Sequence, residues 1–428
     1  MMPHLRRHHR FTWLPSAILD TIALQDAPPY TQLLAVGCPD DFLAVRVGLP
    51  NVTGIPWLAR RIIARASATW SDYVNPTGDA PWVPLTFAYG GLDLDAIATA
   101  ADAPTAVTVG ANRADRGTGE TANPSWTWTD WAPVHSLPRS DAPNGMRVLM
   151  LRMLVPQRQQ ITYANGAYVA WTGRSALHRG YDYATAKWNA DVVTNPQPID
   201  AGEAALGHGH NSIACVQFLT RHAGVTGMIT GDSHHAGTST ATQFSNCLLR
   251  ATVAMGAPLV GQMPLGYATC ATGGARSAQF FPRLLSLLPA IRPGFVVLPG
   301  WTFNDTSDGV RADAAACEVF LARLLQAADA CAAAGALPIF LTPFPRDAGE
   351  MGPEQVGPWL RLRNGVLGLR ATGALVLDAA PLLGGESDGV LDGTYLPEMS
   401  SDAVHPNDVG HAALAAELEP LLQMAIRA

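Results

Sequence analysis

The segment ITGDSHHAGTST, residues 229–240, ends an apolar run in Gly-Asp-Ser followed by two histidines. A serine hydroxyl is a poor nucleophile until a neighbouring base takes its proton, and that base needs a third group to fix its tautomer. The segment SDAVHPN, residues 401–407, supplies Asp402 and His405 three residues apart. We expect Asp402 to orient His405 and His405 to face Ser233, which would make the hydroxyl nucleophilic.

Acyl transfer also needs donors that are preorganised around a developing oxyanion, usually backbone N–H groups and a side-chain amide. The segment GWTFND, residues 300–305, offers Asn304. The segment ATGGARS, residues 271–277, offers glycine N–H groups that can approach a ligand closely. Trp301 and Phe303 flank Asn304, and they either wall an acyl pocket or only stabilise the loop.

Strands and helices alternate after residue 222 and predict an α/β domain over residues 223–428. Strands are expected at 227–231, 258–265, 295–300, 338–343 and 374–380. Helices are expected after Ser239 and at 277–291, 313–335, 355–369 and 409–426. Alternation of this kind implies right-handed crossovers and a parallel sheet covered on both faces, a doubly wound three-layer fold. Its active site is expected at the carboxyl ends of the strands, where Ser233 follows the first of them.

Residues 1–222 read as short strands separated by clusters of turn residues, which predicts an all-β sandwich or jelly-roll-like domain. Strands are expected at 42–50, 83–91, 105–111, 125–134, 146–156, 159–164 and 214–220. Trp126 and Trp128 share one face of a strand, with Trp131 close behind. They form either a sugar-stacking platform or, as is more common, packing between two sheets.

Four of these segments resemble, in chain order, the blocks of the SGNH (GDSL-type) serine hydrolases. The blocks are Gly231-Asp232-Ser233, then Gly274, then Asn304-Asp305, then residues 402–406. The resemblance covers about residues 223–428 and implies a flavodoxin-like sheet. It also implies that Ser233 is the nucleophile, His405 the base, Asp402 its orienting carboxylate, and that the Ser233 N–H, the Gly274 N–H and Asn304 form the oxyanion hole.

The chain departs from the pattern of that family in three places. His234 and His235 follow the serine, where the family commonly has Leu, Ile or Thr. Gly300 lies four residues before Asn304, where the family usually has Gly two residues before Asn. The choice of Gly274 over Gly273 rests only on the residues that follow it, so both glycines stay candidates.

The resemblance implies a serine esterase that acts on short-acyl esters without a metal or organic cofactor. A β-rich domain in front of this fold resembles carbohydrate esterases that remove acetyl groups from polysaccharides. Two alternatives stay open: a lipase or thioesterase for longer acyl chains, and a non-catalytic carbohydrate-binding protein with a decayed hydrolase domain. In that last case Asp232 and Ser233 would only cap a helix, and His405 and Pro406 would only start one.

The remaining histidines have simpler interpretations. His234 and His235 are a metal pair, substrate contacts or, as adjacent loop histidines more often are, partly exposed side chains. Of the two, His234 is the candidate for touching substrate. His208 and His210 have no third ligand at suitable spacing, so a polar loop is favoured over a metal site.

Composition excludes several classes of partner. The net charge of −7 and the lack of a basic block beyond residues 6–10 argue against nucleic acid. No run approaches the roughly 20 apolar residues that span a bilayer. Six scattered cysteines predict buried thiols with one bridge at most: Cys38, Cys215, Cys247, Cys270, Cys317 and Cys331. The basic start has no clean cleavage site, and both the compartment and the oligomeric state stay open.

Overall fold

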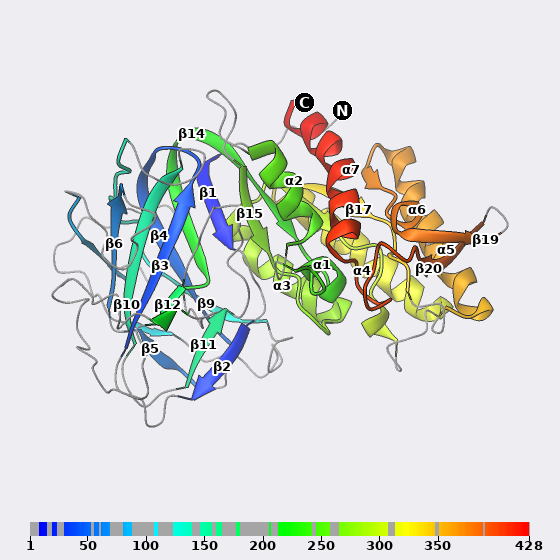
Figure 1. Ribbon diagram of the computed structural model, residues 1–428, viewed down its shortest axis with the longest axis horizontal. Helices are drawn as coiled ribbons and strands as arrows, with labels where there is room; N and C mark the ends of the chain where they lie inside the picture. Colours follow the sequence, from blue (N-terminus) through cyan, green and yellow to red (C-terminus); the bar gives the residue numbers. More distant parts are fainter. Residues whose placement is uncertain are drawn as a thin grey trace. The chain divides into compact units, whose positions relative to one another are not determined.

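The computed structural model divides into two compact units (Figure 1), a β unit and an α/β unit. The β unit comprises His8–Gly224 and the α/β unit Val225–Met255 and Leu265–Ala428, each within the described residues. These are residues 8–14, 19–23, 30–52, 55–59, 61–68, 80–87, 107–109, 123–138, 146–155, 160–164, 177–179, 205–206, 213–241, 245–256, 265–306, 313–346, 351–387 and 390–427.

A parallel sheet forms the centre of the α/β unit. Its strands lie in the order β15-β14-β16-β17-β18, and every pairing among them is parallel. Their bounds are β14 Cys215–Ile229, β15 Leu265–Thr269, β16 Phe295–Leu298, β17 Leu337–Leu341 and β18 Leu375–Leu377. Nearly all of their residues in this unit are buried, as expected for a parallel sheet covered on both faces. The predicted doubly wound α/β class is confirmed.

The strand order fixes which face each helix covers. The chain steps from β14 to β15 in one direction and from β15 over to β16 in the other. Because such crossovers are right-handed, this reversal moves the connecting helix to the opposite face. Thus α2 covers one face while α3, α4 and α5 pack in succession on the other. The helices are α1 Ser233–Ala236, α2 Cys247–Gly256, α3 Ser277–Ile291, α4 Ala314–Ala333, α5 Pro353–Gly368, α6 Ala380–Leu383 and α7 Asp408–Arg427, with 3-10 turns η5 Phe303–Asp305 and η6 Leu369–Thr372.

Two features of this unit differ from the sequence-based expectations. The strand predicted over 258–265 falls on residues 258–264, which lie outside the described residues, and the described strand β15 begins at Leu265. The hairpin of β19 Gly384–Ser387 and β20 Val390–Tyr395 was not predicted, because Gly384, Gly385 and Gly393 are typical of loops. The helices predicted at 277–291, 313–335, 355–369 and 409–426 are present within two residues at each end.

The β unit is antiparallel in every described pairing, which confirms the predicted β-rich class. One sheet has the order β13-β12-β3-β10-β6-β7, and β4 pairs with β9 and with the first half of β14. The strands are β1 His8–Leu14, β2 Leu19–Ala23, β3 Tyr30–Cys38, β4 Phe42–Asn51, β5 Trp57–Ala59, β6 Arg61–Ser67, β7 Val83–Leu85, β8 Val107–Val109, β9 Ser125–Trp128, β10 Arg147–Val155, β11 Gln160–Ala164, β12 Leu177–Arg179 and β13 Ala205–Leu206. The strands predicted separately at 214–220 and 227–231 are one continuous strand, β14.

Two of the three tryptophans pack in the core of the β unit. Trp128 and Trp131 are buried, and the guanidinium of Arg46 lies 4.9 Å from each ring. Trp126 stacks on Trp128 with ring centroids 5.6 Å apart. The core-packing interpretation therefore holds for Trp128 and Trp131, because a buried ring has no face to offer a sugar.

The structure bears on the predictions for the cysteines, for metal-binding clusters and for membrane-spanning helices. All six cysteines are free and buried, so the one bridge that we allowed is absent. No cluster of metal-binding side chains exists among the described residues, and His208 and His210 lie outside them. Within the described part of the chain, no helix has both the length and the apolarity to span a bilayer.

Gly227 of β14 offers a test of the packing between adjacent strands of the sheet. A Cβ added there would lie 2.4 Å from the ring of Phe295 on β16, whereas one at Gly365 in α5 would make ordinary contact at 3.6 Å. We expect Gly227→Ala to lower the free energy of unfolding by about 2 kcal/mol. We expect the matched control Gly365→Ala to raise it by about 0.5–1 kcal/mol, because alanine loses less backbone entropy in a helix. Urea denaturation followed by circular dichroism measures both, and equal midpoints would contradict this packing.

Candidate active site

The sharp turn after β14 carries Ser233 at the first position of α1. Gly231 has φ 139°, and a Cβ on it would lie 2.5 Å from the ring of His235, so only glycine fits this position. Asp232 is the N-cap of α1 and accepts the His234 N–H at 3.0 Å. The turn therefore places Ser233 at the carboxyl end of β14, beside β16, where the strand order of the sheet reverses.

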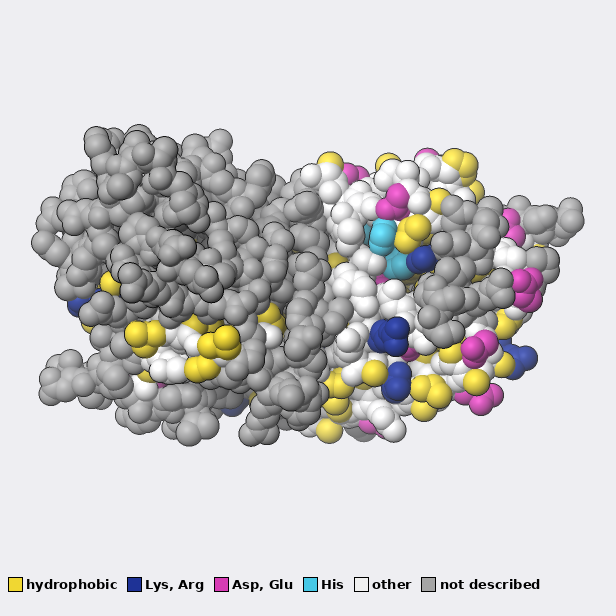
Figure 2. Space-filling view, turned by 90° about the horizontal axis from the view of Figure 1, so that it is seen from below, with side chains coloured by type: hydrophobic (Ala, Val, Ile, Leu, Met, Phe, Trp, Pro, Cys, Tyr) yellow, Lys and Arg dark blue, Asp and Glu magenta, His cyan; other side chains and the backbone are white. Residues whose placement is uncertain are grey.

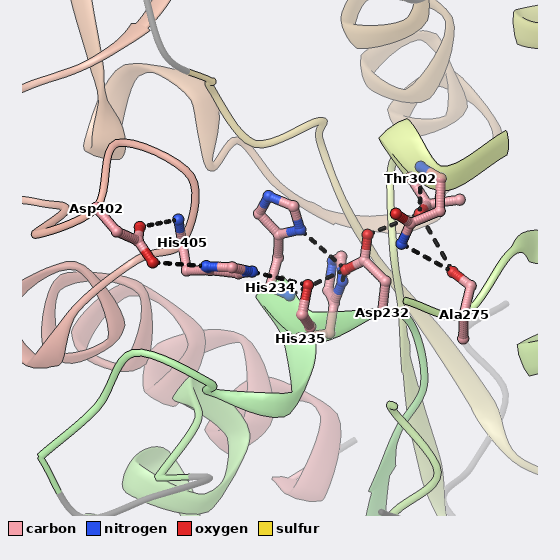
Figure 3. Close-up of polar contacts among 9 residues, drawn as sticks. Asp232, His234, His235, Ala275, Thr302, Asp402 and His405 are labelled. Atoms are coloured by element: carbon pink, nitrogen blue, oxygen red, sulfur yellow. Dashed lines mark hydrogen bonds and ion pairs between the residues drawn. The ribbon is translucent and has the colours of Figure 1, made fainter. Parts of the chain in front are cut away.

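Ser233, His405 and Asp402 form one hydrogen-bonded chain (Figure 3). The Oγ of Ser233 lies 2.8 Å from Nε2 of His405, and Nδ1 of His405 lies 2.8 Å from Oδ2 of Asp402. An ionised carboxylate only accepts, so Nδ1 carries the proton and Nε2 is left to accept the serine proton. The structure thus brings together three residues from two segments that are 172 positions apart.

The loop before α7 holds Asp402 by several donors. Its Oδ1 accepts the backbone N–H groups of Val404 at 2.9 Å and His405 at 2.7 Å. Its Oδ2 accepts the hydroxyl of Ser239 at 2.7 Å. Burial acts to raise the pKa of Asp402, but the hydrogen bonds from His405, Ser239 and Val404 outweigh it and hold the pKa well below its usual range. Asp402 therefore stays ionised, and its 41% exposure to water also favours the charged form.

The environment of His405 favours the neutral imidazole. Burial lowers the pKa of His405 and the neighbouring His234 lowers it further, while Asp402 and Asp232 act in the opposite direction. The net shift is downward, so the ring is an unprotonated base at neutral pH. Histidine side chains reach the surface of the α/β unit beside a hydrophobic and a basic side chain (Figure 2), and the side chain of His405 is 18% exposed.

A second carboxylate, that of Asp232, directly precedes Ser233 in the chain. Asp232 is fully buried, and its Oδ1 lies 3.1 Å from Nδ1 of His234 and 3.0 Å from Nδ1 of His235. Its Oδ2 accepts the hydroxyl of Thr302 at 2.7 Å. Burial opposes ionisation, yet the two histidines hold the pKa of Asp232 well below its ordinary value.

The expectation that His234 and His235 are partly exposed is wrong. They are 4% and 3% exposed because both rings turn inward to compensate the buried charge of Asp232. The His234 ring also packs against Phe303 and Phe344, with centroids 6.5 and 6.2 Å away. A direct contact between His234 and substrate stays a prediction.

Two of the predicted oxyanion donors, Gly274 and Asn304, lie on the loops that follow β15 and β16, and the third, the Ser233 N–H, lies at the start of α1. Asn304 donates one side-chain N–H to the carbonyl of Ala275 at 3.2 Å, which ties these two loops together. A Cβ on Gly273 would lie 4.0 Å from Cβ of Ser233, whereas one on Gly274, at φ 68°, would meet nothing within 4 Å. Gly273 is thus the glycine beside the nucleophile, and Gly274 occupies the left-handed turn next to it.

Trp301 and Phe303 take different positions around Asn304. Both are buried, at 3% and 2% exposed. Trp301 packs edge to face against Phe320 of α4 with centroids 5.3 Å apart, which directs it into the helix layer. Phe303 contacts the His234 ring, and the guanidinium of Arg346 lies 5.0 Å above its ring. Of the two rings, Phe303 is therefore the one with a described contact to the catalytic region.

Sequence reasoning missed four residues that shape the site: Ser239, Thr302, Arg346 and Tyr395. Ser239 and Thr302 were hidden because a lone hydroxyl residue has no distinctive spacing. Tyr395 comes from the hairpin that was not predicted, and its hydroxyl is buried without a hydrogen-bond partner among the described residues. Burial, followed by Asp232, raises the pKa of Tyr395 well above its ordinary value, and Asp402 adds to this while Arg346 opposes it.

No protein-family model and no curated protein matches the chain. Among solved structures, the chain is similar to a GDSL-like lipase from Bacteroides thetaiotaomicron VPI-5482, with 16% identity over 47% of this chain and 88% of that chain and a TM-score of 0.37. A lipase/acylhydrolase from Enterococcus faecalis has 18% identity over 47% and 96%, with a TM-score of 0.36. A catalytic mutant of an acetylxylan esterase from Geobacillus stearothermophilus has 16% identity over 46% and 92%, with a TM-score of 0.34.

The buried charge of Asp232 predicts a stability difference between the two carboxylates. We expect Asp232→Asn to lower the free energy of unfolding by about 3 kcal/mol, because the amide leaves buried donors unpaired. The matched control Asp402→Asn removes a carboxylate that is 41% exposed and should cost less than about 1 kcal/mol. Urea midpoints at pH 7 measure both. Equal losses of free energy of unfolding in the two variants would contradict the distinction between the buried carboxylate of Asp232 and the exposed one of Asp402.

Proposed function

We propose that the chain is a serine esterase that hydrolyses short-acyl esters. The observation that carries this proposal is the chain from Ser233 Oγ to His405 Nε2 at 2.8 Å and from His405 Nδ1 to Asp402 at 2.8 Å. It joins a nucleophile, a base and an orienting carboxylate in the order that acyl transfer requires. The lowered pKa of His405 supports its service as a base at neutral pH.

The proposed reaction has two halves. The Ser233 oxygen adds to the ester carbonyl while its proton passes to Nε2 of His405. The bond to the alcohol then breaks as His405 returns that proton to the leaving oxygen, which leaves the acyl group on Ser233. Water attacks the acyl-enzyme by the same route, with His405 first taking and then returning a proton, and the free acid departs.

Stabilisation of the tetrahedral intermediate falls to backbone and amide donors. The Ser233 N–H, the Gly274 N–H and the Asn304 side chain are the proposed donors, with the Gly273 N–H as the alternative to Gly274. Asn304 has a second side-chain hydrogen besides the one given to Ala275, and that hydrogen would serve the oxyanion. A donor of this kind typically contributes a factor of about 10²–10³ in kcat.

The proposed substrate is a short acyl ester, and within that class an acetyl group on carbohydrate. Phe303 and Phe344 pack against the ring of His234, and Phe344 stacks on His235 at 4.8 Å. These buried rings lie behind His234, whose ring contacts His405, and we propose that they limit the space for a long acyl chain on that side. The carbohydrate alcohol rests on the resemblance to carbohydrate esterases that carry a β-rich domain in front.

Ser233→Ala tests the proposal itself. We expect it to lower hydrolysis of p-nitrophenyl acetate by about 10³-fold or more, because the remaining site has no nucleophile to form an acyl-enzyme. Asp402→Asn should keep Ser233 but lose about 10³–10⁴-fold, because an amide no longer fixes the tautomer of His405. Ser286→Ala, on the exposed face of α3, is the matched control and should retain the wild-type rate. Turnover that survives Ser233→Ala would contradict the proposal.

Acyl length and alcohol type define the substrate. In a series of p-nitrophenyl esters from acetate to decanoate, we expect kcat/KM to be highest for acetate and to fall with chain length because the aromatic rings obstruct longer chains. Acetylated oligosaccharides should release acetate, measured against unesterified oligosaccharide as the control. A maximum at decanoate would favour a lipase, and activity on aryl acetates without release from saccharides would contradict the carbohydrate part.

A further inference from the structure

His234 contacts both the buried carboxylate of Asp232 and the ring of His405. Its Nδ1 bonds to Asp232 at 3.1 Å, and its ring centroid lies 5.1 Å from that of His405, with the ring planes inclined by 46°. Figure 3 shows the His234 ring directed to the Asp232 carboxylate and lying next to His405. One side chain therefore touches both the buried anchor and the base.

The hydrogen bond to Asp232 fixes how the His234 ring is presented. Asp232 is an ionised acceptor, so the bond requires a proton on Nδ1 of His234. The ring is further packed by Phe303 and Phe344 and is 4% exposed. A ring held by one hydrogen bond and two aromatic neighbours has little freedom to rotate, and it offers His405 a rigid surface.

We propose that His234 is a positioning residue for the general base, holding the His405 imidazole in the orientation that faces Ser233. This inference rests on the proposed esterase function and deepens it, because it assigns a task to the side chain that follows the nucleophile. The His405 ring is otherwise held by two hydrogen bonds, one to Ser233 and one to Asp402, whose side chain is 41% exposed. Neither bond packs against the face of the ring, and His234 supplies that contact.

The same contact affects protonation. The ionisable groups around His405 among the described residues are Asp402 on its own loop, Asp232 and His234 on the nucleophile turn, and His411 on α7. Tyr395 on β20 has Asp232 and Asp402 as neighbours. His234 lowers the pKa of His405, so its removal raises that pKa. Asp232 also raises the pKa of His405, and this effect is no longer opposed by His234 once that side chain is removed.

Two substitutions separate the ring from the hydrogen bond. His234→Asn keeps an N–H near the position of Nδ1 and removes the ring. His234→Phe keeps a ring against His405 and removes the N–H. His235→Asn is the matched control, because His235 bonds to the same Asp232 oxygen at 3.0 Å but stacks on Phe344, and its described ring contacts do not include His405.

The test is a titration of the His405 imidazole in the full chain. Nuclear magnetic resonance of histidine-labelled protein gives the midpoint, and the signal is identified by its loss in His405→Gln. We expect the midpoint to rise in both His234 variants, because the lowering effect of His234 is removed, and to stay at the wild-type value in His235→Asn. The acid limb of kcat/KM should move with it, because activity needs neutral His405 and is lost as pH falls through its pKa.

The kinetic constants of the variants separate the effect of the His234 ring from that of its hydrogen bond to Asp232. His234→Asn should lower plateau kcat/KM by about tenfold to a hundredfold, since a misplaced base lowers the rate steeply. His234→Phe should lose less because it keeps the ring. The proposal would be overturned if His234→Asn, His234→Phe and His235→Asn all kept the wild-type His405 midpoint and lost plateau kcat/KM equally. His234 would then have a structural role only.

The failure of this inference can be told apart from failure of the function. Wild-type protein that does not hydrolyse esters would contradict the proposed esterase function. The titration midpoint of His405 would still show whether His234 affects that ring. Should His234→Asn not fold, His234→Phe decides the question by its plateau kcat/KM, because it keeps the ring that is proposed to position His405. A loss of about tenfold to a hundredfold in His234→Phe, as large as that expected for His234→Asn, would overturn the inference.

Discussion

The candidate site is built around one buried charge, the carboxylate of Asp232. A charge removed from water is costly unless it is paired and hydrogen-bonded. Here the compensation comes from Nδ1 of His234 and His235, from the hydroxyl of Thr302 and from the His234 N–H. These donors come from the segments after β14 and β16, so satisfying the charge also joins the two loops that carry Ser233 and Asn304.

The sheet brings those loops to the same place. Parallel strands end at one edge, and at the reversal between β14 and β16 the neighbouring connections leave towards opposite faces. The remaining residues of the site come from the far end of the chain. The loop before α7 reaches this edge and is tied to the segment that carries Ser233 by Ser239 bonding to Asp402. An ion pair between Arg250 and Asp408 joins α2 to the start of α7.

The site therefore has two carboxylates in contrasting environments. Asp402 is exposed and is kept ionised by hydrogen bonds from its own loop, so it can orient His405. Asp232 is buried and is kept ionised by two imidazoles, so it can anchor the turn. His234 contacts both Asp232 and the ring of His405, which gives a physical reason for a histidine at this position.

Local sequence pattern is enough to establish the doubly wound class and to predict candidate residues for the site. Apolar strands alternating with long helices require a covered parallel sheet. Ser233 and Asn304 are candidates because each follows a predicted strand, and His405 is a candidate because it lies three residues after Asp402 in the loop before the last helix. Other features depend on contacts between distant segments: His234 and His235 turn inward, Gly273 lies beside Ser233, and Ser239 bonds to Asp402. The periodicity of apolar residues in the sequence shows which face of a helix or strand is buried. The hydrogen-bond partner of a buried polar group, in contrast, often comes from a distant segment that only the folded chain brings near.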